Sequence, residues 1–274
     1  NIELVNNKNI VNYFNIYSNS FKSVNIIANR YNTPSNYLDV NNNLIIPSGI
    51  DSFINEVVSN QFAVSNEDFS TINYLNDRKN RLTSNNLIIG SSFSFSNKSK
   101  KSIYDNEFSE FKLKIELAGN LTNLTSNLLN VSKDEFGKNK VLGLTYSQFL
   151  KTETGYIKHW PIGLNSIIAF RSFFGIAIPF GNSNNIPFSK SFFAGGSNDN
   201  RAWEVYRLGP GSSEALSEFN EANMKIAMNI EYRFKILGKL DGALFTDIGN
   251  IWNVFDDTKD SKRTFSSLRD LDEI

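Results

Sequence analysis

The chain of 274 residues carries 28 Lys and Arg against 28 Asp and Glu, so its formal net charge is zero. This balance argues against a nucleic-acid-binding protein, which usually shows a basic excess. The absence of cysteine excludes disulfides, thiolate nucleophiles and Cys-ligated metals, and the single histidine, His159, excludes a His-based metal cluster. We therefore expect no catalytic residues, no metal site, no cofactor and no nucleic-acid partner.

The first predicted element is a short amphipathic helix over residues 48–62. Its apolar residues recur at helical spacing, and they are Ile50, Phe53, Ile54, Val57 and Val58. Ser48 stands where an N-cap would be expected. We interpret this helix as a packing element within a loop or turn.

Strands are predicted next, because apolar residues alternate with polar or small ones. The pattern covers four segments, which are 87–96, 111–120, 142–151 and 168–180. The minor parity of these segments carries Gly, Ala, Ser and charged residues rather than the large apolar residues of a soluble core. No apolar run approaches the roughly 18 residues of a membrane-spanning helix, whereas a transmembrane barrel hides its apolar face in such alternation.

The clearest strand begins at Met224 and alternates for thirteen residues. At about 3.4 Å per residue it is roughly 44 Å long, about twice the usual strand of a soluble sheet. Antiparallel sheets with one wet face also alternate, but length and repetition favour a membrane barrel. Aromatic residues near strand ends are candidates for interfacial girdles or for packing, and they are Tyr156, Trp160, Phe180 and Trp252.

A long loop, residues 181–220, precedes the Met224 strand and contains Arg201-Ala202-Trp203. The strand after that one contains Phe245, Asp247 and Gly249 at alternate positions. Parity places Asp247 on the polar face of its strand. Without further information, Arg201 and Asp247 are simply residues of unrelated turns.

These motifs resemble those of the BamA/TamA superfamily of outer-membrane assembly barrels, also called the bacterial surface antigen family. In that family the sixth loop folds into the barrel lumen with an Arg-Gly-aromatic tip, and a Phe-x-Asp-x-Gly strand faces it. The resemblance implies that Arg201, Ala202 and Trp203 form a latch and that Asp247, Phe245 and Gly249 form its partner. Ala202 departs from the commoner Gly. The segments 195–198 and 208–211, Gly-Gly-Ser-Asn and Leu-Gly-Pro-Gly, look most like the TamA-like lipoprotein branch, TamL.

The resemblance implies an all-β fold, a transmembrane antiparallel β-barrel of sixteen strands when complete. Residues 1–274 would form a single partial barrel domain, covering roughly the middle of the barrel to strand thirteen. The long loop at about 181–220 would fold inward, and POTRA domains and the last strands would lie outside the chain.

The implied function is non-enzymatic, the insertion or translocation of other proteins at the bacterial outer membrane. Implied partners are outer-membrane lipids, client outer-membrane or surface proteins, and a TamB-like periplasmic protein. Two alternatives stay open. One is a passive outer-membrane pore or nutrient receptor, and the other is a soluble secreted β-protein, such as a carbohydrate-active enzyme.

Three further features are interpreted as ordinary structure. We place His159 at a turn between strands. The stretch 209–213, Gly-Pro-Gly-Ser-Ser, has neither a preceding buried strand nor a following helix with Lys-Ser/Thr, so it is a weak match to a phosphate-binding loop. The acidic residues Asp256, Asp257 and Asp260 are read as a solvated loop.

Overall fold

The computed structural model describes residues 2–5, 23–83, 86–102, 104–129, 131–134, 137–213, 220–258 and 260–273. The chain divides into two compact units. The first comprises residues 1–5, 86–215 and 219–274, and the second comprises residues 6–85 and 216–218. The predicted extent of a single barrel domain over residues 1–274 stays a prediction.

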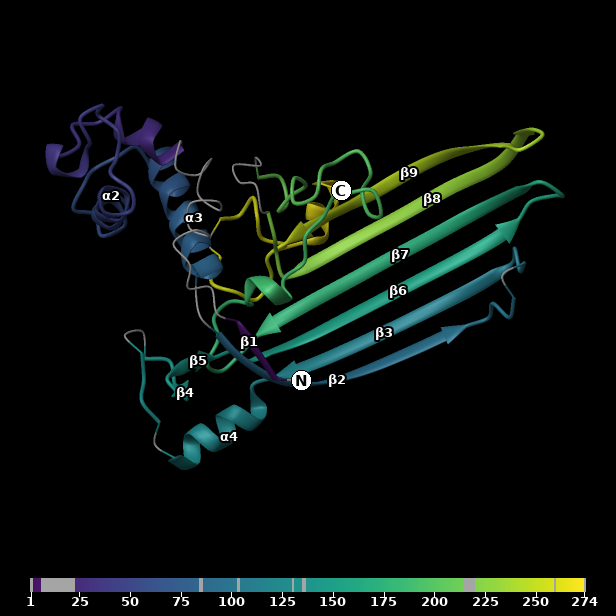
Figure 1. Cartoon of the computed structure of the whole chain (residues 1–274), viewed down its shortest axis with the longest axis horizontal. Helices are drawn as coiled ribbons and strands as arrows, with labels where there is room; N and C mark the ends of the chain where they lie inside the picture. Colours follow the sequence, from purple (N-terminus) through teal and green to yellow (C-terminus); the bar gives the residue numbers. More distant parts are fainter. Residues whose placement is uncertain are drawn as a thin grey trace. The chain divides into compact units, whose positions relative to one another are not determined.

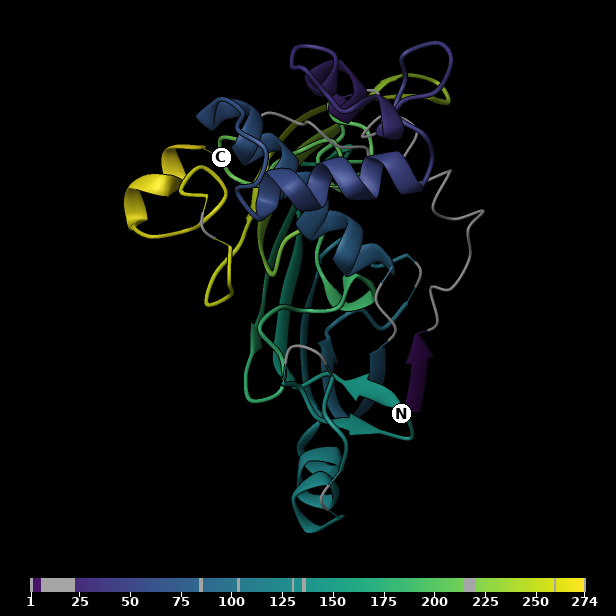
Figure 2. The same ribbon diagram turned by 90° about the vertical axis from the view of Figure 1, so that its left-hand side faces the viewer.

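The first unit is built on a sheet of nine strands (Figure 1). The strands are β1 Ile2–Val5, β2 Asn86–Lys98, β3 Phe108–Ala118, β4 Lys140–Val141, β5 Leu144–Tyr146, β6 Phe149–Pro161, β7 Ser166–Pro179, β8 Met224–Leu237 and β9 Leu240–Trp252. The order is β4-β5-β2-β3-β6-β7-β8-β9, with β1 also paired to β2, and only the short β2–β5 pair is parallel. Figure 2, viewed nearly along the strands, shows them as a curved wall.

The two ends of this sheet differ in their connections. At one end, short segments join β2 to β3 (99–107), β6 to β7 (162–165) and β8 to β9 (238–239). At the other end, residues 119–148 and residues 180–223 join the remaining long strands (Figure 1). The first of these long connections carries α4 Asn120–Leu129 and the strands β4 and β5, and the second carries the 3-10 helix η2 Phe188–Lys190.

The strand register sorts side chains onto two faces, because residues directly opposite in antiparallel strands share a face. One face, called here the outer face, carries large apolar side chains that are exposed. Its exposed members include Phe93, Phe95, Ile115, Leu117, Leu150, Trp160, Phe174, Met228, Ile230, Tyr232, Leu244 and Ile248. The other face, called here the inner face, carries charged, small and polar residues. This pattern confirms the predicted fold class, an all-β antiparallel sheet forming part of a barrel.

The second unit is helical in its described part, residues 23–83. Its helices include η1 Ser35–Tyr37, α2 Ser48–Val58 and α3 Asn66–Thr83, and η3 Leu268–Glu273 belongs to the first unit. The predicted helix is confirmed in α2, and its apolar side is the core of this unit, with Ile50, Phe53, Ile54 and Val57 fully buried. The predicted N-cap was wrong: Ser48 is the first helical residue, and Pro47 occupies the cap position without a side-chain hydrogen bond.

Two strand predictions also need correction. Residues 142–151 do not form one strand, because Leu142 and Gly143 turn the chain with φ values of 53° and 78°, and Ser147 and Gln148 interrupt it again. The backbone N–H of Gln148 donates to the Ser183 hydroxyl instead of to a strand neighbour.

His159 does not lie in a turn. It belongs to β6, where it pairs with Ala169 and stacks its ring on Phe108 at 4.3 Å between centroids. The interpretation of His159 as a structural residue is consistent with this packing.

None of the helices in the described part of the chain combines the length and the hydropathy that a membrane crossing requires.

Candidate functional site

The site forms where the long connection between β7 and β8 lies on the inner face of the sheet. Two distant parts of this connection are paired with each other, since Phe192 and Ala222 exchange backbone hydrogen bonds of 2.7 and 2.9 Å. The Phe192 ring fills the space above Gly175 in β7, where an added Cβ would come within 2.5 Å of the ring. Glycine at this position therefore lets the connection approach the strand. Residues 214–219 of the predicted loop lie outside the described residues.

Arg201 binds Asp247 of β9 with its side chain and its backbone. Its Nε and Nη2 donate to the two carboxylate oxygens of Asp247, each at 2.7 Å, and its backbone N–H donates to Oδ2 at 3.0 Å. The side chain of Asp247 is only 6% exposed. Asn229 of β8, opposite Asp247 in the register, donates a fourth hydrogen bond to the carboxylate at 2.9 Å. The two residues are thus brought together from 46 positions apart.

A second carboxylate completes the guanidinium's surroundings. Glu231 of β8 accepts from Arg201 Nη1 at 2.7 Å, and its other oxygen accepts from Arg233. The Phe245 ring lies beneath the guanidinium, 3.6 Å from Cζ to the ring centroid, in cation–π geometry. A planar ion with five donors suits this combination of two carboxylates and a ring face.

The sequence placed Glu231 on the polar parity of its strand but gave no reason to single it out. The signal that identifies it is the β8–β9 register, in which Glu231 stands opposite Phe245 and Asn229 opposite Asp247. The sequence motif of Phe245, Asp247 and Gly249 does not specify how β9 pairs with β8.

A further ion pair holds the loop tip, defined here as residues 198–201. Lys225 of β8 is largely buried, and its Nζ donates to Asp199 at 2.8 Å and to the carbonyl of Phe193 at 2.7 Å. Asp199 also accepts from the backbone N–H of Gly195 at 2.8 Å. Arg171 of β7 donates to the Asn198 carbonyl at 2.5 Å. Acidic side chains of the sheet therefore bind Arg201 of the loop, and basic side chains of the sheet bind Asp199 and backbone carbonyl groups of the loop.

Two predicted latch residues lie apart from the carboxylates. Trp203 is 49% exposed, and its backbone contacts are to Asn200 and Gly196 within the loop. Ala202 is also exposed, and it is not among the described residues with a positive φ. Alanine in place of the commoner glycine is therefore compatible with the local backbone.

Gly249 is required by close approach of the backbone and the loop. A Cβ at this position would come within 2.7 Å of the Ile226 carbonyl oxygen, 2.9 Å of Asn200 Oδ1 and 3.1 Å of Ala227 Cα. The first and third of these atoms belong to the backbone of β8 and have little freedom to move.

We expect Gly249→Ala to lower the thermal stability of the folded protein, since overpacking of this kind costs about 1–3 kcal/mol. The measurement is the temperature at which the protein in membranes loses its compact form on a cold detergent gel. Gly155→Ala is the matched control, because a Cβ there has its nearest neighbours at 4.0 Å. Equal midpoints for the two variants would contradict the packing argument.

The remaining candidates are structural. Gly211 donates to the Ile251 carbonyl and accepts from the Asn250 side chain, so the Gly-Pro-Gly stretch packs on β9 rather than around a ligand. Asp256 and Asp260 accept hydrogen bonds from turn amides. Within the described residues no group of three or more His, Asp or Glu side chains is placed to hold a metal ion.

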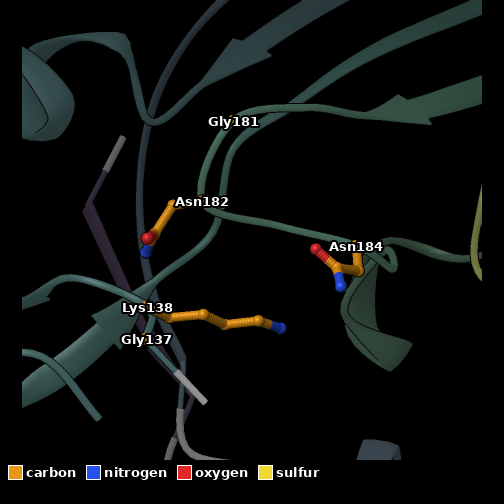
Figure 3. Close-up of a pocket in the computed structure, with 5 residues that line it drawn as sticks. All are labelled: Gly137, Lys138, Gly181, Asn182 and Asn184. Carbon is orange, nitrogen blue, oxygen red and sulfur yellow. The ribbon is translucent and has the colours of Figure 1, made fainter.

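A polar hollow of about 320 Å³ lies near the long-connection end of the sheet (Figure 3). Gly137, Lys138, Gly181, Asn182 and Asn184 line it. The Asn182 side chain already bonds the backbone of Asn139 at 2.8 and 3.0 Å and the Tyr146 carbonyl at 3.0 Å. Its amide thus serves to hold two connections together, and the hollow does not gather a set of reactive groups.

In a comparison with known families, residues 12–271 match the Omp85 superfamily domain. No curated protein matches the chain.

Proposed function

This chain belongs to the Omp85 superfamily, and from this membership we propose that it is part of a bacterial outer-membrane barrel that inserts or translocates other proteins without covalent chemistry. The superfamily acts in outer-membrane protein assembly and translocation. The observation that carries the proposal for this chain is the docking of Arg201 on Asp247 and Glu231 at the inner face.

The physical argument concerns shape. An assembly barrel has to open at a seam while the rest of its wall keeps its form. A loop bound to neighbouring strands by charged hydrogen bonds crosslinks those strands beyond their backbone ladder. In this chain Arg201 joins β8 and β9, and Arg171 and Lys225 fasten the same loop to β7 and β8. We infer that this latch, Arg201 with Asp247 and Glu231, keeps the wall rigid during client insertion.

The outer face supports a membrane location. Large apolar side chains on it are exposed in neighbouring strands, such as Phe93 at 60%, Ile230 at 49% and Leu244 at 67%. A soluble protein rarely exposes a continuous apolar surface of this extent. Lipid is therefore the proposed neighbour of this face.

The finer assignment is to a TamA-like role. It rests on the glycine-rich segments that flank the latch. Gly195 and Gly209 both have a positive φ, and a Cβ at either would come within 2.3 Å of another atom. These segments therefore suit the fold of the loop as well as the resemblance to TamL. A TamB-like periplasmic protein is the proposed partner, and outer-membrane or surface proteins are the proposed clients.

The proposal predicts faster client folding in vesicles that contain the full-length protein. A urea-unfolded outer-membrane barrel would be added to phosphatidylcholine vesicles with and without the protein, and its folded fraction would be followed over time on a cold detergent gel. We expect faster folding with the protein than in empty vesicles, because assembly factors lower the barrier to insertion.

Flux of a small solute through the same vesicles distinguishes the assembly role from the main alternative, a passive pore. Solute flux without faster client folding would identify a passive pore and overturn the assembly role. A protein that stays in solution without detergent would overturn the membrane location as well.

A further inference from the structure

The helix α4 exposes two leucines, Leu121 and Leu124. It follows β3 after a single residue, Gly119, and none of its ten residues is charged. Leu121 is 63% exposed and Leu124 is 60% exposed. Helices on the surface of a soluble protein normally turn such residues toward the core.

The polar side of α4 is the side that packs on the protein. Thr122 and Ser126, one helical turn apart, are each 3% exposed. The Ser126 hydroxyl lies 3.1 Å from the hydroxyl of the buried Tyr146, which in turn donates to Asn123 Oδ1 at 3.0 Å. Burial at these positions of α4 is therefore inverted, since the hydroxyls of Thr122 and Ser126 face the protein whereas Leu121 and Leu124 are exposed.

The direction of α4 is fixed where it leaves the sheet. Gly119 has a φ of 84°, and its backbone N–H donates to the Ile89 carbonyl at 2.8 Å. A Cβ on Gly119 would come within 2.5 Å of both the Gln148 side chain and the Ser147 carbonyl oxygen. The strand-to-helix turn is thus packed tightly, and it does not leave α4 free to rotate its leucines inward.

The strand that leads into α4 carries exposed apolar side chains up to its end. Leu117 near the end of β3 and Leu150 beside it in β6 are 39% and 38% exposed on the outer face. In both Figure 1 and Figure 2, α4 lies beyond the end of β3 and away from the loop that binds the inner face. Leu121 and Leu124 therefore lie just beyond the end of the surface that the proposed function assigns to lipid.

We propose that α4 is an interfacial membrane helix, whose Leu121 and Leu124 insert among lipid acyl chains while its polar side is held by Tyr146. This proposal rests on the membrane location given under the proposed function. The leaflet follows from the connections, because outer-membrane barrels have short periplasmic turns and long extracellular loops. The long connection that carries α4 assigns it to the outer leaflet. A helix with one apolar and one polar side suits the boundary between headgroups and acyl chains.

The absence of cysteine from these 274 residues permits a depth measurement. Leu124→Cys would be introduced into the full-length protein, with any cysteine elsewhere replaced, and labelled with an environment-sensitive fluorophore. The protein would be reconstituted in phosphatidylcholine vesicles containing lipids with a spin label either near the headgroup or near the end of the acyl chain. We expect a loss of fluorescence with the shallow label, a smaller loss with the deep label, and little quenching by aqueous iodide.

Two matched positions distinguish failure of this proposal from failure of the proposed function. Ile115→Cys on the outer face of β3 tests whether the sheet is in the membrane. Lys101→Cys in the exposed β2–β3 connection gives the reference signal of a position in water. Quenching of Ile115→Cys by lipid labels, with Leu124→Cys open to iodide like Lys101→Cys, would overturn the interfacial helix alone. Lipid quenching at neither Ile115→Cys nor Leu124→Cys would overturn the membrane location on which both proposals depend.

Discussion

A protein carrying Arg201→Cys and Asp247→Cys is expected to form a disulfide spontaneously in isolated membranes. The expectation does not depend on the length of the arginine side chain, because the backbone nitrogen of Arg201 already lies 3.0 Å from Asp247 Oδ2. This contact is compatible with the Cα separation of about 4.4–6.8 Å that a disulfide requires. The readout is a mobility shift on a gel that reductant reverses.

The control pair is Arg201→Cys with Asp241→Cys. Asp241 lies on the same face of the same strand as Asp247 but six residues earlier, or about 20 Å away at the usual strand rise. We expect no crosslink in this pair and none in either single variant. If the Asp241 pair crosslinks as efficiently as the Asp247 pair, the loop is mobile over the inner face. Arg201 is then not held at Asp247, and the proposed latch is wrong.

The long strands could be predicted from the sequence because their alternation is uninterrupted. β8 begins at Met224 as predicted, and β7 differs from its prediction by one or two residues at its ends. The prediction failed at residues 142–151, where alternation continues across two breaks. The turn at Leu142 and Gly143 and the side-chain contact at Gln148 are set by other parts of the fold. Local periodicity does not contain that information.

The same distinction holds for the site. The contact of Asp247 with Arg201 was expected from the family resemblance, and the parity of Asp247 agreed with it. The second carboxylate, Glu231, was not expected, because it depends on which residues of β8 and β9 stand opposite one another. The ion pair of Lys225 with Asp199 was not expected, because it depends on how the loop lies on the sheet. Register is a property of strand pairing, and one strand's sequence does not specify it.

The two carboxylates that share Arg201 are expected to differ in importance. Asp247 Oδ2 accepts the backbone N–H and the Nε of Arg201, and Oδ1 accepts Arg201 Nη2 and the Asn229 amide. In Asp247→Asn the new amide group would face two donors in either orientation of the side chain. Because the carboxylate is nearly buried, we expect a loss of about 3–5 kcal/mol in the free energy of unfolding. Urea titration of the protein in vesicles measures it.

Glu231→Gln is the matched variant, since it makes the same chemical change on the other partner. The Glu231 side chain is 18% exposed, and each of its oxygens accepts a single hydrogen bond from an arginine. Water can replace one of these bonds, so we expect a loss of about 1 kcal/mol or less.

Trypsin provides an independent readout of the latch, because cleavage after Arg201 requires that its side chain leave the sheet. We expect rapid cleavage at this bond in Asp247→Asn, and slow cleavage in Glu231→Gln and in the unchanged protein. Arg207, which is more exposed and forms an ion pair with Glu204 of the same loop, serves as the internal reference site. If Asp247→Asn leaves the ratio of cleavage at Arg201 to cleavage at Arg207 unchanged, Lys225 and Arg171 hold the tip without the latch. The rigidity that an opening barrel needs would then lie in those contacts instead.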